Sequence, residues 1–248
     1  MEFAIDVAGH VIGVRTGSGY VHGLCARYMT DRPVERTFEV TPEDIASERA
    51  EVERMNATVT DPRQRASLGP GSLEWMALHR QVSDYLLGFD TMLFHGSCVA
   101  VDGLCYLFMA PSGTGKSTHT ALWMELFGER AMMVNGDKPF VHVARDGITA
   151  YGSPWDGKEH LSTNVGLPLH AIAIVHRGQE NHIEPIVRDA RMHELARGAY
   201  VPDGAASRLK AAILMDEILA QVSIYSLTCN MEPEAAGCSY GMMSGGVR

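Results

Sequence analysis

The chain contains the stretch Ala110-Pro111-Ser112-Gly113-Thr114-Gly115-Lys116-Ser117-Thr118. This stretch fits the phosphate-binding pattern G-x-x-x-x-G-K-[ST] except at its first position, where Ala110 replaces glycine. An apolar, strand-like run over residues 104–109 precedes it, and a helical pattern over about 116–127, closed by Gly128, follows it. A chance match is the alternative, but it would not need this order of strand, loop and helix. We therefore predict a phosphate-binding loop (P-loop) at residues 110–117.

The residue types of this loop suit a nucleoside triphosphate. Gly113 and Gly115 permit the backbone angles and the close approach with which N–H groups surround a phosphate. The dipole at the start of the following helix favours an anion. Lys116 brings a cation to the β- and γ-phosphates, and the Ser117 hydroxyl can bind Mg²⁺. The predicted nucleotide-binding residues are Pro111, Ser112, Gly113, Thr114, Gly115, Lys116, Ser117 and Thr118.

A metal-binding acid is expected where the strand after the loop's helix ends. The short apolar run 131–134 is followed by Asn135-Gly136-Asp137, so Asp137 is the candidate, and its neighbour Lys138 could contact a phosphate or the substrate. The alternative is an ordinary turn, because Asn-Gly-Asp favours turns; both interpretations can hold at once. Ser117 and Asp137 are the predicted metal ligands, since both offer oxygen atoms, which Mg²⁺ prefers.

A second dense group of polar side chains lies at residues 151–160, after a predicted strand. Functional residues concentrate on loops that a rigid scaffold holds. Phosphoryl transfer needs cations near the phosphates and a platform for the acceptor. We predict Trp155, Asp156, Lys158 and Glu159 as substrate-binding residues. The alternative, a surface loop with Trp155 as its packing anchor, remains open.

The segment before residue 89 has the pattern of a small α+β unit. Strands are predicted at 3–7, 11–15 and 20–28, with residues 17–19 as a hairpin turn between the last two. Thr41, with Asp44 as a capping-box acid, is predicted to cap a helix that begins at Pro42 and runs to about residue 55. Residues 56–71 read as a polar linker, and a second helix runs from Ser72 to about residue 88.

Residues 89–248 have the pattern of an α/β core. Strand-like runs at 92–101 and 104–109 flank the turn signal Asp102-Gly103, and runs at 140–143 and 148–151 flank Asp146-Gly147. Further strands are predicted at 131–134, 169–175 and 222–229, with 182–187 as a partner of 169–175. Helices are predicted at 188–198 and 208–221, a helical turn at 232–238, and a frayed tail at 244–248.

Composition excludes several classes of protein. The chain has 248 residues, 46% hydrophobic residues and a net charge of −9. This charge argues against a general affinity for nucleic acid or an anionic membrane. No apolar run reaches the roughly 18–20 residues of a membrane span, and the N-terminus does not resemble a secretory signal. Five cysteines without a CxxC pair favour neither disulfides nor zinc, so a cytoplasmic protein is expected.

Residues 90–145 resemble the catalytic domain of HPr kinase/phosphorylase, which is itself similar to the nucleotide-binding core of phosphoenolpyruvate carboxykinases. The resemblance rests on Phe94-His95-Gly96, the hairpin through residues 102–103, the P-loop, and Asn135-Gly136-Asp137-Lys138. It extends weakly to about residue 190. Residues 1–88 do not resemble the first domain of the bifunctional enzyme, and the signature for binding its HPr substrate is not recognisable. A stand-alone relative is the expectation.

The resemblance implies a mixed β-sheet and ATP-dependent phosphorylation of a hydroxyl with Mg²⁺ as cofactor. It implies that His95 lies near the transferred phosphate and that Asp137 holds metal or the attacking hydroxyl, so the predicted catalytic residues are Asp137, His95 and Lys116. The family has two adjacent aspartates where this chain has Gly136 and Asp137. We expect Gly136→Asp to preserve or raise transfer. For His95, a structural role in a strand is the alternative.

The combined expectation is an α/β fold with a P-loop kinase-like core of mixed sheet at residues 89–248 and a small α+β segment at 1–88. The expected partners are ATP and an unidentified hydroxyl-bearing acceptor, a protein serine or a small metabolite, and a homo-oligomer is compatible. A nucleotide-binding regulator with weak or no transfer is the second hypothesis, because one carboxylate is missing. Two residues stay open: His119 faces solvent or nucleotide, and Arg177 reaches a phosphate or is a surface cation.

Overall fold

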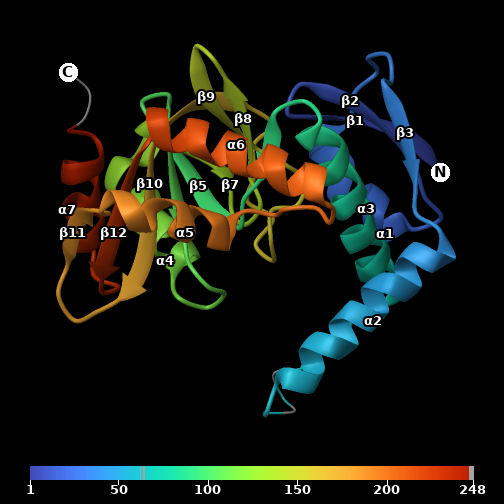
Figure 1. Cartoon of the computed structure of the whole chain (residues 1–248), viewed down its shortest axis with the longest axis horizontal. Coiled ribbons are helices and arrows are strands. Elements are labelled where there is room, and N and C mark those ends of the chain that lie inside the picture. Colours follow the sequence, from blue (N-terminus) through green and yellow to red (C-terminus); the bar gives the residue numbers. More distant parts are fainter. Residues whose placement is uncertain (62, 64, 246–248) are drawn as a thin grey trace. The chain divides into compact units, whose positions relative to one another are not determined.

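The computed structural model describes residues 1–61, 63 and 65–245 (Figure 1). The chain forms two compact units, Met1–Tyr85 and Leu86–Arg248. The sequence-based boundary lies at residues 88–89, within three residues of this division. The long helix α3 (Pro70–Leu87) ends just across it. Each unit is described separately.

The first unit has a three-stranded sheet in the order β1-β2-β3. Strands β1 (Glu2–Val7) and β2 (His10–Arg15) form an antiparallel hairpin, and β3 (Arg36–Glu39) lies parallel to β2. The hairpin turns at Ala8 and Gly9, which both have positive φ angles, 52° and 83°. Helix α2 (Pro42–Thr58) begins with the predicted capping box of Thr41 and Asp44. The loop that follows α2 includes Pro62, which lies outside the described residues.

The prediction of a strand over residues 20–28 is wrong. This segment forms helix α1 (Gly19–Cys25) followed by a 3-10 turn, η1 (Ala26–Tyr28). The Ser18 hydroxyl accepts a hydrogen bond from the Val21 N–H, so residues 17–19 begin a helix and are not a hairpin turn. The buried side chains are Val21, Cys25 and Tyr28, and their spacing of four and three residues puts them on one helical face. The preference for strand in Val21 and Tyr28 is overridden by this packing.

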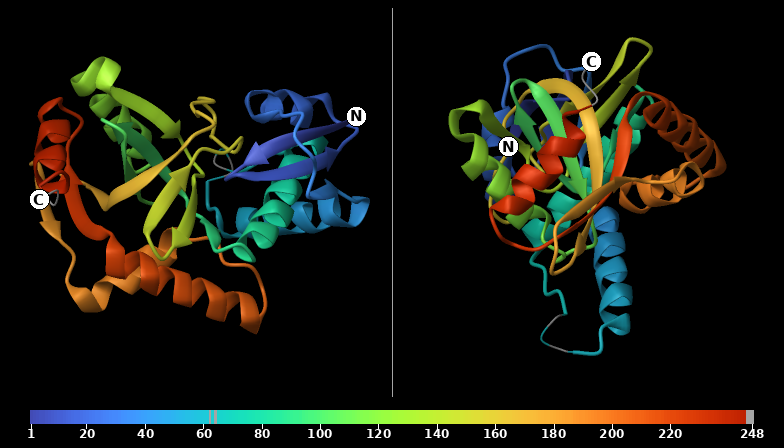
Figure 2. Two further views of the ribbon diagram at one scale, coloured as in Figure 1. Left: turned by 90° about the horizontal axis from the view of Figure 1, so that it is seen from above. Right: turned by 90° about the vertical axis from the view of Figure 1, so that its left-hand side faces the viewer.

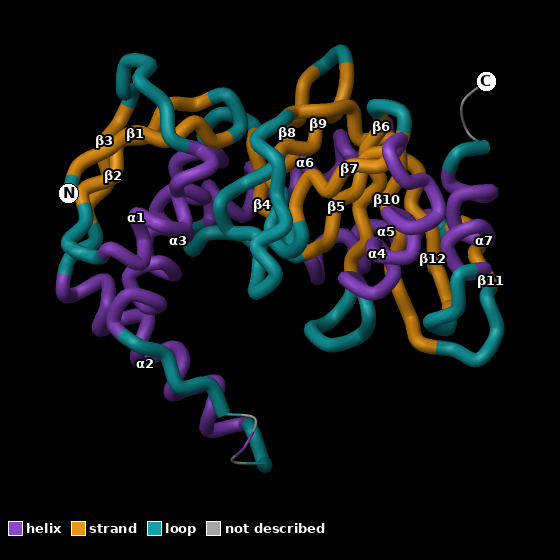
Figure 3. Tube along the Cα trace, turned by 180° about the vertical axis from the view of Figure 1, so that it is seen from behind, coloured by secondary structure: helices purple, strands orange, loops and turns teal. Residues whose placement is uncertain are grey.

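The second unit is built on a curled, mixed nine-stranded sheet (Figures 2 and 3). Its main path has the order β4-β8-β9-β10-β6-β5-β7, and β12 pairs with β10 and β11. The strands are β4 (Thr91–Leu93), β5 (Gly96–Val101), β6 (Leu104–Met109), β7 (Ala131–Asn135), β8 (Phe140–Ala144), β9 (Gly147–Tyr151), β10 (Gly166–Arg177), β11 (His182–Pro185) and β12 (Ser223–Cys229). The predicted α/β class and mixed sheet are therefore confirmed.

Strand β10 changes partners along its length, which curls the sheet. Gly166, Leu167 and Pro168 pair with β9 in antiparallel fashion. From Leu169 onward the strand runs parallel to β6, and from Ala171 also parallel to β12. Because both edges of this part of β10 are occupied, the prediction that residues 182–187 pair with it is wrong. Strand β11 pairs with β12 in antiparallel fashion.

Helices cover both faces of this sheet. Helix α4 (Lys116–Phe127) and helix α7 (Glu234–Met243) pack on one face through a core that includes Trp123, Phe108 and Ala236. Helix α5 (Arg188–Gly198) and helix α6 (Ala205–Gln221) pack on the other, with Leu195 and Ile218 in the core. Helix α7 is longer than the predicted turn at 232–238. Residues 246–248 of the predicted frayed tail lie outside the described residues.

One predicted turn and one predicted strand near the site have different outcomes. Asp102 and Gly103 form the predicted hairpin turn, with φ angles of 51° and 82°. The predicted strand 92–101 is instead interrupted: β4 pairs with β8, whereas β5 pairs with β6 and β7. His95 lies at this break.

No helix among the described residues combines the length and the apolar character that crossing a bilayer requires. All five cysteines are free thiols; four are buried, and Cys238 is partly exposed. Cys98 and Cys105 lie in neighbouring strands β5 and β6 and are fully buried. They pack as small hydrophobic residues.

Candidate functional site

The glycine-rich loop connects the end of β6 to the start of α4, in the predicted order of strand, loop and helix. Gly113 and Gly115 have φ angles of 76° and 120°, which residues with a side chain rarely adopt. The Thr114 N–H donates to the Pro111 carbonyl at 3.2 Å, and the His119 N–H donates to the Gly115 carbonyl at 2.9 Å. The loop therefore turns tightly on its glycines and leads directly into the first turn of α4.

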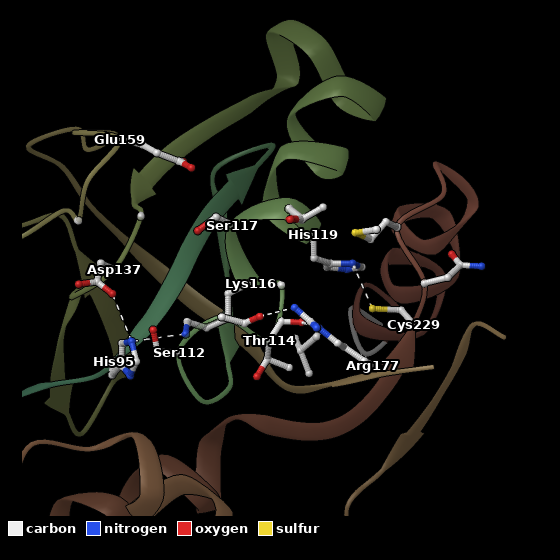
Figure 4. A pocket seen from close by; sticks show the side chains of 18 of the residues that line it. His95, Ser112, Thr114, Lys116, Ser117, His119, Asp137, Glu159, Arg177 and Cys229 are labelled. Atoms are coloured by element: carbon white, nitrogen blue, oxygen red, sulfur yellow. Dashed lines mark hydrogen bonds and ion pairs between the residues drawn. The ribbon is translucent and has the colours of Figure 1, made fainter. Parts of the chain in front are cut away.

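A cavity of about 1100 Å³ opens over this loop (Figure 4). Its wall includes loop residues 112–115 and residues 116–119 of α4. The other lining residues are His95, Gly136, Asp137, Asp156, Gly157, Lys158, Glu159, Val175, Arg177, Gly178, Gln179, Cys229, Asn230, Met231 and Glu232. In Figure 4, His95 and Asp137 lie on one side of Lys116, and Arg177 and Cys229 lie on the other. One cavity thus combines most of the predicted nucleotide-binding residues with the predicted catalytic residues.

Lys116 lies at the centre of this arrangement. Its Nζ donates to the Ala110 carbonyl at 2.9 Å and lies 3.4 Å from His95 Nε2. The side chain is buried. Burial lowers the pKa of Lys116 because it disfavours the ammonium, and the nearby Asp137 charge partly opposes this shift. The ammonium is held close to both predicted catalytic partners.

Asp137 forms two ion pairs, one with His95 Nε2 at 3.3 Å and one with Lys138 Nζ at 2.5 Å. Burial by itself would raise the pKa of Asp137. The hydrogen bond from His95 and the charge of Lys138 outweigh it, and the pKa lies well below its usual value. Asp137 is therefore ionised at any physiological pH. Lys138 is not among the residues that line the cavity.

Asn135 fixes the backbone that carries Asp137, and the sequence analysis did not assign it a role. Its Oδ1 accepts hydrogen bonds from the N–H groups of Asp137 and Lys138 at 2.8 and 2.6 Å. Its Nδ2 donates to the Ser153 carbonyl at 2.9 Å, and the residue is fully buried. The segment is an asparagine-stabilised turn, and that turn places Asp137 at the cavity wall; the role of Asp137 as a metal ligand stays a prediction. The turn signal was visible in the sequence.

Gly136 sits where only glycine fits. A Cβ atom at this position would lie 2.9 Å from the Asp156 carbonyl oxygen and 3.4 Å from that of Leu161. The Gly136 N–H donates to the Leu161 carbonyl at 2.9 Å, so the contact is part of a bonded backbone pair. The segment that follows Trp155 therefore occupies the space that a second carboxylate at position 136 would need.

The predicted substrate-binding residues divide into two groups. Lys158 and Glu159 are exposed and line the cavity. Asp156 also lines it but is buried, and its carboxylate accepts from Ser162 Oγ at 2.8 Å and pairs with His160 Nδ1 at 3.2 Å. Trp155 does not line it.

Trp155 is 4% exposed and packs edge-on against Phe140, with 6.3 Å between the ring centres. This burial favours the alternative interpretation, in which Trp155 is a packing anchor, and its role as an acceptor platform stays untested. Trp155 anchors its loop. Pro111 is exposed and is likewise absent from the cavity wall; its carbonyl stabilises the loop turn.

The sequence did not decide the surroundings of His119 and Arg177, which the structure describes. His119 points into the protein, where its Nε2 is hydrogen-bonded to Ser239 Oγ of α7 at 2.9 Å. Burial lowers the pKa of His119 to about 4, so the ring is neutral at pH 7. Arg177, at the end of β10, donates from Nε to the Thr114 carbonyl at 3.0 Å and from Nη2 to the Gly113 carbonyl. It is exposed but engaged with the loop.

The residues around the cavity fit a magnesium ion that also binds phosphate. Within the described part of the chain, no three His, Cys, Asp or Glu side chains gather in a cluster that could hold a metal alone. The Ser117 hydroxyl and the Asp137 carboxylate both line the cavity. Mg²⁺ commonly binds one or two protein oxygen atoms and completes its coordination shell with phosphate and water. The Ser117 hydroxyl and the Asp137 carboxylate would supply these two oxygen atoms.

Comparisons with known proteins give little beyond this geometry. No protein-family model matches the chain, and no curated protein matches it. Among solved structures, the Hpr(Ser) kinase/phosphatase from Coxiella burnetii is similar over 62% of this chain and 99% of that chain, with 8% identity and a TM-score of 0.35. A TM-score of this size does not indicate a shared fold.

Proposed function

We propose that this protein is a phosphotransferase that moves the γ-phosphate of ATP to a hydroxyl of an acceptor. The observation that carries the proposal is the convergence of Lys116, Asp137 and His95 beside the glycine-rich loop in one cavity. A phosphate-binding loop, a buried cation and an ionised carboxylate next to a histidine are the parts that phosphoryl transfer requires. The sequence resemblance of residues 90–145 to HPr kinase/phosphorylase supports a hydroxyl acceptor.

In the proposed mechanism, the loop and Lys116 bind the phosphates. Backbone N–H groups of the loop and the start of α4 supply positive ends of dipoles. Lys116 Nζ, now bonded to the Ala110 carbonyl, turns to the β- and γ-phosphates. Ser117 and Asp137 would hold Mg²⁺, which neutralises phosphate charge when bound. Positioning and electrostatics supply most of the rate, because the transition state of phosphoryl transfer is loose.

His95 and Asp137 orient the acceptor hydroxyl in this proposal. Asp137 lies 3.3 Å from His95 Nε2 and fixes the imidazole. With its lowered pKa, the Asp137 carboxylate is a weak base, so we assign it the tasks of holding charge and positioning. Because Nε2 donates to Asp137, the other ring nitrogen of His95, Nδ1, takes up the hydroxyl proton as the acceptor attacks. Lys158, Glu159 and Asp156 form the acceptor side of the cavity.

The acceptor is proposed as a protein serine or a small metabolite, and the reaction as cytoplasmic. The test is to incubate the protein with Mg²⁺ and γ-labelled ATP in a cell extract and to identify which compound or protein gains label. Asp137→Asn is the matched control, because it removes the charge and keeps the size. Label that appears equally with wild type and Asp137→Asn would contradict the proposal.

A nucleotide-binding regulator with little or no transfer is the second candidate. Two observations favour it: position 136 has no room for a second carboxylate, and the Asp137 carboxylate is already bonded to His95 and Lys138. Under this proposal the protein binds ATP and changes its interaction with a partner instead of phosphorylating it. Nucleotide binding without label transfer to any extract component would select this candidate.

A further inference from the structure

Strand β10 extends past the end of β6 and runs beside the glycine-rich loop. Met109, the last residue of β6, pairs with Ile174, and β10 continues for three more residues to Arg177. This extension is supported on its other edge by β12, where Arg177 pairs with Cys229. Residues 110–115, which follow β6, therefore have a rigid strand end as their neighbour.

The Arg177 side chain uses this position to bind two successive peptide groups of the loop. Nε donates to the Thr114 carbonyl at 3.0 Å, and Nη2 donates to the Gly113 carbonyl. The planar fork of a guanidinium can bond both oxygens at once, which the single ammonium of lysine does less well. These bonds link residues 63 and 64 positions apart.

The two bonds constrain more than two oxygen atoms. A peptide group is planar, so fixing the Gly113 and Thr114 carbonyls also fixes the directions of the Thr114 and Gly115 N–H groups. The loop needs this help because Gly113 and Gly115 are free to adopt many backbone angles. A loop that binds phosphate through its N–H groups benefits when these groups are ordered before the ligand arrives.

We propose that Arg177 is a positioning residue that sets the conformation of the glycine-rich loop in the nucleotide-free protein. The contact between Arg177 and the loop is part of the structure itself; its consequence for nucleotide affinity rests on the proposed function. The competing role is direct contact of Arg177 with a phosphate, since the residue also lines the cavity.

Hydrogen exchange of the nucleotide-free protein tests the positioning role without any ligand. The informative amides are Thr114, bonded to the Pro111 carbonyl, and His119, bonded to the Gly115 carbonyl. Exchange of residues 110–119 should be about tenfold faster in Arg177→Ala and nearly as fast in Arg177→Lys. Arg145→Ala, in the exposed turn between β8 and β9, is the control and should match the wild type. Unchanged exchange in Arg177→Ala overturns the proposal.

Binding measurements separate this proposal from the proposed function. Arg177→Ala should weaken both ATP and inorganic triphosphate about tenfold, and Arg177→Lys should restore little of the loss. If lysine restores binding fully while exchange is unchanged, Arg177 contacts phosphate directly and the positioning role is wrong. If the wild type binds neither compound, the proposed function fails, and the exchange experiment still decides the role of Arg177.

Discussion

The carbonyl oxygen of Asp156 lies 2.9 Å from the point where a side chain at Gly136 would begin. This contact leaves no room at position 136 for a second carboxylate beside Asp137. The loop that carries Asp156 is itself held by hydrogen bonds from Asn135 to Ser153 and from Ser162 to Asp156. The loop and a second acid at 136 therefore exclude each other.

Gly136→Asp should destabilise the protein by about 1–3 kcal/mol, the usual cost of forcing extra atoms into a packed site. The obstructing atom belongs to the backbone and cannot move aside cheaply, whereas the effect of the substitution on phosphate transfer stays a prediction. Urea unfolding measures the effect. Gly237→Ala in α7, where an added Cβ meets nothing within 4 Å, is the control. Equal stability of Gly136→Asp and wild type would show that the loop relocates.

Local sequence signals predicted one part of the site and long-range contacts determined the other. The loop at 110–115, the bounds of α4 and the Asn135 turn follow from residues close in sequence, and all three were predictable. The carbonyl of Asp156 against Gly136 and the bonds from Arg177 to the loop join residues 20 or more positions apart. No periodicity or motif encodes such contacts. Tyr20 to Tyr28 was mistaken for a strand because β-propensity depends on context.

Lys116→Ala should weaken ATP binding about 100-fold, since it removes the buried ammonium that is bonded to the glycine-rich loop at Ala110. Titration calorimetry with ATP and Mg²⁺ measures the dissociation constant. Lys210→Ala is the control and should bind ATP like the wild type. Lys210 lies on α6, where it forms an ion pair with Asp90. If Lys116→Ala binds ATP as tightly as the wild type, the loop is not a phosphate site.

Trp155→Ala and Lys158→Ala should have different effects, because we expect Trp155 to anchor its loop and Lys158 to bind the acceptor. Trp155→Ala removes a buried ring and should cost about 3–5 kcal/mol of stability. Lys158 is exposed in the cavity wall, so Lys158→Ala should leave the stability unchanged and raise the KM of the acceptor. Thermal melts and steady-state kinetics measure the two effects. If Trp155→Ala is stable and raises the KM of the acceptor, Trp155 binds the substrate and is not merely an anchor.

His119 should make stability depend on pH in a defined window. Burial lowers its pKa from 6.5 to about 4, so the unfolded chain binds the proton first as the pH falls. The contribution of the neutral ring is complete above pH 6.5 and is lost between pH 6.5 and 4, by about 3 kcal/mol at most. Urea unfolding at several pH values should show a shallower loss in His119→Gln. Parallel curves for the two proteins would contradict the assigned burial.

The last prediction decides between a kinase and a regulator, and it concerns His95. Nε2 of His95 lies 3.3 Å from the Asp137 carboxylate and 3.4 Å from Lys116 Nζ, so it touches both groups that the transfer needs. If the protein is a kinase, the wild type transfers label, and His95→Ala lowers kcat by about 10²–10⁴-fold, as loss of a general base does. ATP affinity should change little, because His95 is not part of the loop. Arg145→Ala serves again as the surface control.

A regulator would show ATP binding in both proteins and transfer in neither. If the wild type transfers phosphate and His95→Ala transfers it equally well, the kinase proposal stands, and the proton must leave the acceptor by another route.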